Sequence, residues 1–136
     1  MTPGWKIAIA VRDDLEVWQK LNVTAFVTSG IGTRYPELIG EPYVDGSGVG
    51  YLPKLGLPCL IYAGDGPALR RAFDRALGRA LGVSVYTDEL FSTGNDVDNR
   101  AAVAAVATEA LTIAGFAVAG PAKQVDKAFD KLKFHP

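Results

Sequence analysis

Two side chains of this sequence offer the chemistry of a nucleophile and its base, the thiol of Cys59 and the imidazole of His135, which are the only cysteine and the only histidine. A thiolate beside an imidazole can attack a carbonyl carbon. Cys59, however, follows Pro58 inside an apolar run, and buried thiols are mostly inert core side chains. A single Cys and a single His also exclude an internal disulfide and a cysteine-based zinc site. We therefore expect a structural cysteine, no metal and no cofactor.

Three arginines recur at every fourth residue and would lie along one face of a helix, namely Arg71, Arg75 and Arg79. A stripe of guanidinium groups can bind phosphate. Asp74 lies among them, and it stands at i+4 from Arg70, where the two side chains can pair. Charged helix faces of this kind are mostly solvated, so a solvated face is the favoured interpretation.

Short apolar runs alternate with amphipathic segments along the chain, which is typical of buried strands alternating with helices. Strands are expected over residues 6–12, 59–63, 82–86 and 111–119, and helices over residues 13–32, 67–81, 96–107 and 123–131. The inward face of the first helix is expected to hold Leu15, Trp18, Leu21, Ala25 and Phe26, and a glycine at position 30 or 32 to end it. Buried strands with helices on both faces of the sheet predict a layered α/β domain.

Residues 33–58 are rich in glycine and proline, which leaves room only for short extended pieces. The stretch over 45–48 lies between two such pieces and predicts a hairpin turn. The glycines over 46–50 lack the spacing of a nucleotide-binding loop, and Tyr51 follows them in place of a helix. We expect no phosphate site there.

With 136 residues, 49% hydrophobic and 21% charged, the chain fits a single folded domain over residues 1–136. Its net charge of −1 argues against a general binder of nucleic acid, which would carry a basic excess. No targeting segment precedes the first apolar run, and no run is apolar enough to span a membrane. We expect a cytoplasmic protein that does not insert into membranes.

The chain resembles an uncharacterised bacterial family, catalogued as a domain of unknown function, that is similar in fold to the second, archaeal and eukaryotic type of peptidyl-tRNA hydrolase. The motifs that carry the resemblance are Lys6 to Val11, Leu38-Ile39-Gly40, Tyr86-Thr87-Asp88, Gly120-Pro121, Val125-Asp126-Lys127 and Leu132-Lys133-Phe134. The closing motifs are the most specific of these. The resemblance implies a three-layer α/β/α fold with a four-stranded mixed sheet of order 2-1-4-3, whose last strand is antiparallel, and a homodimer.

The resemblance also implies a site. In the hydrolases, a lysine of the first helix, an aspartate after the third strand and a hydroxyl four residues later are assigned to ester cleavage. Lys20, Asp88 and Ser92 stand at these positions. A cation can stabilise an oxyanion, a carboxylate can activate water, and a hydroxyl can relay a hydrogen bond. We expect Thr24 and Thr93 to contact the ligand.

Three functions follow from this constellation. We prefer a binder of a small anionic or carbonyl ligand, because several polar positions of the hydrolases hold other residues here, Phe26 and Val27 among them, and because the basic excess of a tRNA binder is missing. The first alternative is an ester hydrolase acting on peptidyl- or aminoacyl-tRNA. The second is a dimeric assembly module without a reaction, in which Lys20 and Asp88 would share no cleft.

Overall fold

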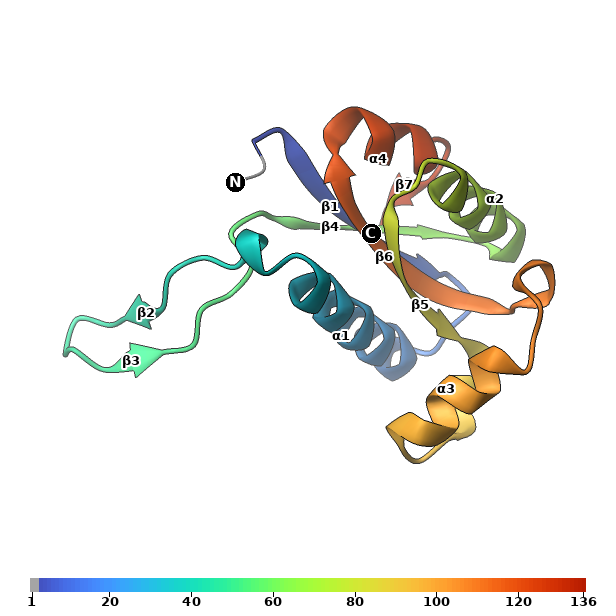
Figure 1. Cartoon of the computed structure of the whole chain (residues 1–136), viewed down its shortest axis with the longest axis horizontal. Helices are drawn as coiled ribbons and strands as arrows, with labels where there is room; N and C mark the ends of the chain where they lie inside the picture. Colours follow the sequence, from blue (N-terminus) through green and yellow to red (C-terminus); the bar gives the residue numbers. More distant parts are fainter. Residues whose placement is uncertain (1–2) are drawn as a thin grey trace.

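The computed structural model describes residues 3–136, and its centre is a five-stranded mixed sheet of order β5-β6-β1-β4-β7 (Figure 1). The strands are β1 (Trp5–Arg12), β4 (Cys59–Gly64), β5 (Gly82–Thr87), β6 (Ile113–Pro121) and β7 (Lys133–Phe134). Strand β1 is parallel to β4 and antiparallel to β6, and β6 is also antiparallel to β5. The four longer strands therefore follow one another as β4, β1, β6 and β5.

The sheet has one strand more than the four that were expected. The additional strand, β7, pairs antiparallel with the outer edge of β4, where Tyr62 faces Phe134 and Ala63 faces Lys133. Two residues are too few to show the alternation that marks a strand in a sequence. Its position matters because it fixes the C-terminal tail against the sheet.

Helices cover both faces of this sheet, which gives three layers (Figure 1). The helices are α1 (Val17–Arg34), α2 (Gly66–Gly78), α3 (Asp96–Ala104) and α4 (Ala122–Ala128). Helix α1 packs on one face, against Ile7, Ile9 and Val11 of β1. Helices α2 and α4 pack on the other face, against Ala8 and Ala10. A mixed α/β domain is thus confirmed.

Helix α1 begins and ends later than expected. Its N-cap is Glu16, whose backbone N–H donates to Gln19 Oε1 at 2.9 Å in a capping box. The helix passes through Gly30 and ends at Arg34, one residue before Tyr35, which precedes Pro36. A residue before proline is disfavoured in the helical region, so the proline and not a glycine ends this helix.

The inward face of α1 also differs from the expectation. Val23, Val27 and Ile31 are buried against the sheet, whereas Trp18, Leu21 and Phe26 are more than half exposed. The helix is apolar on several sides, so hydrophobic spacing alone allows more than one inward face. The close approach of α1 to β6 decides which face points inward. Gly115 of β6 has no side chain, and Val23 of α1 fills the space that this leaves.

Other boundaries move by a few residues. Helix α3 ends at Ala104 and not at 107, a short 3₁₀ turn over Thr108–Ala110 follows, and β6 begins at Ile113. Two further 3₁₀ turns, Pro36–Leu38 and Asp88–Ser92, follow α1 and β5. The second of these, η2, carries two of the predicted site residues.

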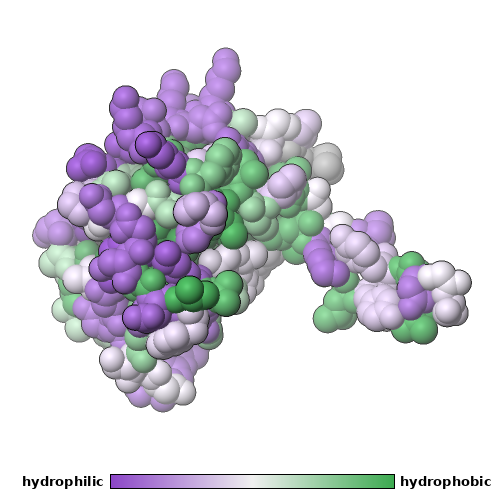
Figure 2. Space-filling view, turned by 180° about the vertical axis from the view of Figure 1, so that it is seen from behind, coloured by the Kyte–Doolittle hydropathy of each residue, from purple (hydrophilic) through white to green (hydrophobic). Residues whose placement is uncertain are grey.

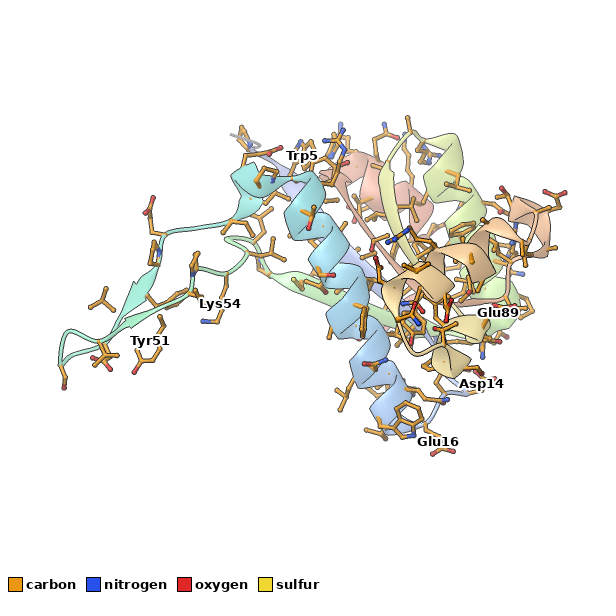
Figure 3. The ribbon with its side chains drawn as sticks, turned by 60° about the horizontal axis from the view of Figure 1, so that its bottom comes forward. Trp5, Asp14, Glu16, Tyr51, Lys54 and Glu89 are labelled. Carbon is orange, nitrogen blue, oxygen red and sulfur yellow. The ribbon has the colours of Figure 1, made fainter. Side chains whose placement is uncertain are left out.

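A hairpin extends away from the body as an arm, here residues 41–54 (Figures 1 and 2). Its strands are β2 (Tyr43–Val44) and β3 (Gly50–Tyr51), antiparallel to each other, so the predicted hairpin turn is confirmed. Within it, the Tyr51 hydroxyl donates to Asp45 at 2.8 Å, and the Lys54 ammonium lies 4.0 Å from the centre of the Tyr43 ring (Figure 3). Both contacts join residues of the arm to each other.

Candidate functional site

Helix α1 has three sides with different surroundings, and two of them line cavities. The core side packs on the sheet as described above. A second side, with Val17, Lys20, Leu21 and Thr24, lines one cavity. The third side, with Trp18, Asn22 and Phe26, lines another. We call these the Lys20 cavity and the aromatic-amide cavity.

The Lys20 cavity has a volume of about 330 Å³ and walls that are mostly apolar. Val11 and Ile61 of the sheet, Val17 and Leu21 of α1, and His135 complete its lining around Lys20 and Thr24. The Thr24 hydroxyl donates to the Lys20 backbone carbonyl at 2.7 Å. The cavity therefore combines one ammonium group with an apolar wall, and no carboxylate lines it.

His135 is the partner of Lys20 in this cavity, since its Nε2 lies 3.3 Å from the lysine Nζ. The other ring nitrogen, Nδ1, lies 2.9 Å from the main-chain oxygen of Pro136. That oxygen only accepts and an ammonium only donates, so Nδ1 is the donor to Pro136 and Nε2 is the acceptor for Lys20. The side chain in contact with Lys20 is thus an imidazole and not a carboxylate.

Strand β7 brings His135 to this position. The His135 backbone N–H donates to Ile61 of β4 at 3.0 Å, and the ring of Phe134 stacks on Tyr62 with centroids 4.8 Å apart. The sequence analysis considered His135 only as a base for Cys59 and did not predict this contact with Lys20. The signal that pointed to it was the specific closing motif, Leu132-Lys133-Phe134, whose place in the fold was not predicted.

Asp88 has a different partner from Lys20. It accepts a hydrogen bond from Arg12 at 2.9 Å, and the same guanidinium also donates to Asp14 at 2.6 Å and to the Ile113 carbonyl at 3.1 Å. These two carboxylates raise the pKa of Arg12, although burial lowers it. The ion pair joins the end of β1 to the turn after β5. Asp88 does not line the Lys20 cavity.

Ser92 and Thr93 lie at the end of η2 and also outside the Lys20 cavity. Ser92 is exposed. The Thr93 hydroxyl donates to the Leu90 carbonyl at 3.0 Å, contacts Asn99 Oδ1, and lines the aromatic-amide cavity. Of the five predicted site residues, the structure brings Lys20 and Thr24 together, and Thr93 belongs to the other cavity.

The arginine stripe and Cys59, the other two features of the sequence, have contacts typical of structural residues. Arg75 donates to the carbonyls of Ala128 and Asp130, and Arg79 donates to Gln124, so two arginines of the stripe tie α2 to the C-terminal region. Cys59 is half-buried, and burial raises the pKa of its thiol. Among residues 3–136, no three His, Cys, Asp or Glu side chains are grouped as metal ligands would be. Nor does any helix in this range have the length and apolarity to cross a membrane.

Among the solved structures that resemble this chain, we describe one that is similar over almost the whole length. It is a protein of unknown function from Agrobacterium tumefaciens strain C58, which is 43% identical, with a TM-score of 0.95 and 98% of each chain covered. The curated proteins include none that matches. The family described as "Protein of unknown function (DUF2000)" matches residues 5–136, so the chain belongs to this family.

Proposed function

We propose that this protein binds a small organic anion, a carboxylate with an apolar body, in the Lys20 cavity. The observation that carries this proposal is the Lys20 ammonium, which faces a mostly apolar cavity and contacts the His135 imidazole and no Asp or Glu side chain of the described residues. An ammonium in such surroundings interacts with an anion more strongly than it does in water. The apolar walls favour a hydrocarbon body on the same ligand.

The remaining predicted residues are not needed to hold the anion. The Thr24 hydroxyl lines the same cavity as Lys20, but its proton is donated to the Lys20 backbone carbonyl, so it offers only an acceptor oxygen. Asp88, Ser92 and Thr93 would join the site only through a rearrangement of η2 that releases Asp88 from Arg12. A bound anion needs none of these three, which is why binding and not catalysis is the preferred function.

The alternative function is hydrolysis of an ester of peptidyl- or aminoacyl-tRNA. The succession of β4, β1, β6 and β5 with an antiparallel β6 favours it, because this is the sheet that the resemblance to the second type of peptidyl-tRNA hydrolase implies. We propose that the two families share this fold. In such a reaction Lys20 would stabilise the oxyanion and Asp88 would orient water.

Titration calorimetry with benzoate and hexanoate tests the preferred function. We expect saturable binding that Lys20→Met weakens about tenfold or more, because this change removes the charge that the carboxylate contacts. Lys123→Met, the same change at an exposed position of α4, is the control. Benzamide, which has the same ring without the charge, should not bind. Equal affinities for Lys20→Met and wild type, or for benzamide and benzoate, contradict the proposal.

A second assay separates the alternative. The protein is incubated with N-acetyl-aminoacyl-tRNA and the released N-acetyl amino acid is measured. The preferred function predicts no release above that of Lys20→Ala. Release that both Lys20→Ala and Asp88→Ala abolish would establish the hydrolase in its place.

We also propose that two copies of this chain associate through the arm. Tyr43, Val44, Val49, Tyr51 and Leu52 are all at least half exposed on it. A two-stranded hairpin is only marginally stable without a surface to pack on. The resemblance implies a homodimer, and a second copy of the chain would provide that surface.

A further inference from the structure

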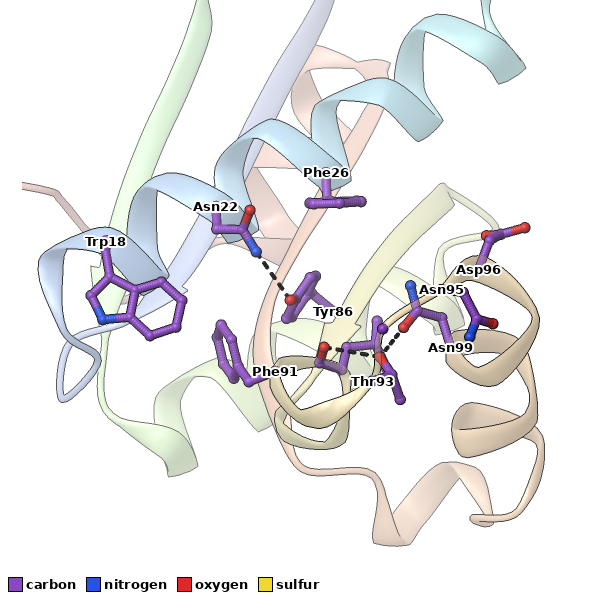
Figure 4. Close-up of a pocket in the computed structure, with 11 residues that line it drawn as sticks. Trp18, Asn22, Phe26, Tyr86, Phe91, Thr93, Asn95, Asp96 and Asn99 are labelled. Carbon is purple, nitrogen blue, oxygen red and sulfur yellow. Dashed lines mark hydrogen bonds between the residues drawn. The ribbon is translucent and has the colours of Figure 1, made fainter.

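The aromatic-amide cavity lies between α1, the end of β5, η2 and the start of α3, and it plays no part in the anion site (Figure 4). Its volume is about 300 Å³, at the lower end of the range for small-ligand sites. Four aromatic rings line it, contributed by Trp18, Phe26, Tyr86 and Phe91.

These rings form one continuous wall. The ring centroids of Trp18 and Phe91 are 5.9 Å apart, those of Phe91 and Tyr86 4.9 Å, and those of Tyr86 and Phe26 6.0 Å. Tyr86 is only 4% exposed, but Trp18 is 60% exposed. The wall therefore presents aromatic surface to solvent at the mouth of the cavity, where a flat ring can stack on it.

Two asparagines and the tyrosine provide the polar groups. Asn22 Nδ2 donates to the Tyr86 hydroxyl at 3.2 Å, which leaves the hydroxyl proton and the Asn22 carbonyl oxygen for other partners. Asn99 Oδ1 contacts the Thr93 hydroxyl, which leaves the Asn99 amide protons. Within the described residues these atoms have no other hydrogen-bond partner, and together they offer one hydroxyl proton, two amide protons and one carbonyl acceptor.

The charge of the cavity is nearly neutral. Its only ionisable lining group besides the Tyr86 hydroxyl is the Asp96 carboxylate, which is paired with Arg100. Burial raises the pKa of Tyr86, so this hydroxyl keeps its proton at neutral pH and remains a donor. An anion finds no free cation here, in contrast to the Lys20 cavity.

We propose that the aromatic-amide cavity binds a neutral, planar heteroaromatic ring that carries donor and acceptor atoms on one edge, the chemistry of a nucleobase. Aromatic side chains stack on the faces of such rings, and asparagine amides pair with their edges. A neighbouring hollow shares Phe26, Tyr86 and Asn99 with the cavity and gives room for a substituent. The net charge of −1 favours a free base or nucleoside over a nucleic-acid chain.

Because Trp18 lines the cavity, its fluorescence can report the binding of a ligand there. The other tryptophan, Trp5, packs on Tyr35 near the end of α1 opposite to Glu16, so Trp5→Phe leaves Trp18 as the only indole (Figure 3). We expect adenine and uracil to quench Trp18 fluorescence in this variant with a saturable curve. Cyclohexanecarboxamide, which has an amide but no aromatic face, and benzoate, which is charged, should give no saturable change.

Two substitutions in the Trp5→Phe background test the polar contacts. Asn99→Leu and Asn22→Leu each remove one amide, and each should weaken adenine binding about fivefold, the effect of one neutral hydrogen bond. Val97→Ala, on an exposed position of α3, is the control and should bind like the parent. Circular dichroism spectra and melting temperatures show whether each variant is folded. If a leucine variant does not fold, shifts of the Asn22 and Asn99 side-chain amide resonances of the wild type on adding adenine replace it.

Three outcomes overturn the proposal. The first is quenching by adenine that does not saturate, together with unmoved asparagine amide resonances. The second is unchanged adenine affinity in both folded leucine variants. The third is tighter, salt-dependent binding of oligoadenylate than of adenosine, which would assign the cavity to a nucleic-acid chain.

Discussion

Lys20 and Asp88 are both partly buried, but their side chains contact different partners. The Asp88 carboxylate is ion-paired with Arg12, whereas Lys20 contacts the His135 imidazole and no Asp or Glu side chain of the described residues. Desolvating Asp88 for a reaction would first require breaking an ion pair at 2.9 Å. An anion arriving at Lys20 replaces no such partner. At the scale of single residues, the arrangement therefore favours anion binding at Lys20 over acid–base chemistry at Asp88.

Also at the scale of single residues, the burial of Cys59 predicts that its thiol reacts slowly. Burial raises the pKa of its thiol, so the reactive thiolate is scarcer at neutral pH than in a free thiol. Alkylation by iodoacetamide should be several-fold slower than that of glutathione at pH 7, and its rate should rise only at higher pH. Mass spectrometry of the alkylated protein over pH 6–10 measures this, with Cys59→Ala as the blank. A rate equal to that of glutathione at pH 7 would show that the thiol is reactive and not a core side chain.

At the scale of elements, α1 links the core to both cavities through its three sides. Hydrophobic spacing was sufficient to predict a helix there, because apolar residues recur every three or four positions. It was insufficient to orient the helix, because Trp18 and Phe26 fit a core face as well as Val23 and Val27 do. The orientation depends on Gly115, a residue of β6 that comes much later in the chain and whose missing side chain leaves space for Val23.

Gly115→Ala tests this packing. A Cβ at position 115 would lie 2.5 Å from Val23 Cγ1 and 2.7 Å from the Ala10 carbonyl oxygen, and the carbonyl belongs to the central strand β1. Neither the strand nor the helix above it can move freely, so we expect the free energy of unfolding in urea to fall by about 2–3 kcal/mol. Gly46→Ala, in the open turn of the arm, should change it by less than about 0.5 kcal/mol. Equal effects of the two substitutions would contradict the close packing of α1 on β6.

At the scale of the whole molecule, the main strands and helices could be predicted from the sequence, but the position of the C-terminal tail could not. The four long strands and the helices on both faces of the sheet were predictable, since the strands are short apolar runs and the helices carry amphipathic periodicity. The position of the tail was not, because β7 has two residues and gains its order from Tyr62 of another strand. For the same reason, the Lys20–His135 contact, between residues 115 positions apart, had no local pattern that predicted it.

The exposed apolar side chains of the arm predict that two copies of the chain associate in solution. If two copies pack through the arm, the wild-type protein should sediment as a dimer at about 100 µM, and Val44→Glu should weaken the dimer at least tenfold by placing a charge in an apolar contact. Val97→Glu makes the same change at an equally exposed position of α3 and should leave the dimer intact. Because Val44 contributes nothing to the buried core, both variants should keep the melting temperature of the wild type when it is measured at a concentration low enough for the wild type to be monomeric. A wild-type monomer at this concentration, or a Val44→Glu dimer as tight as that of Val97→Glu, would mean that the exposed side chains of the arm serve something other than a second copy of the chain.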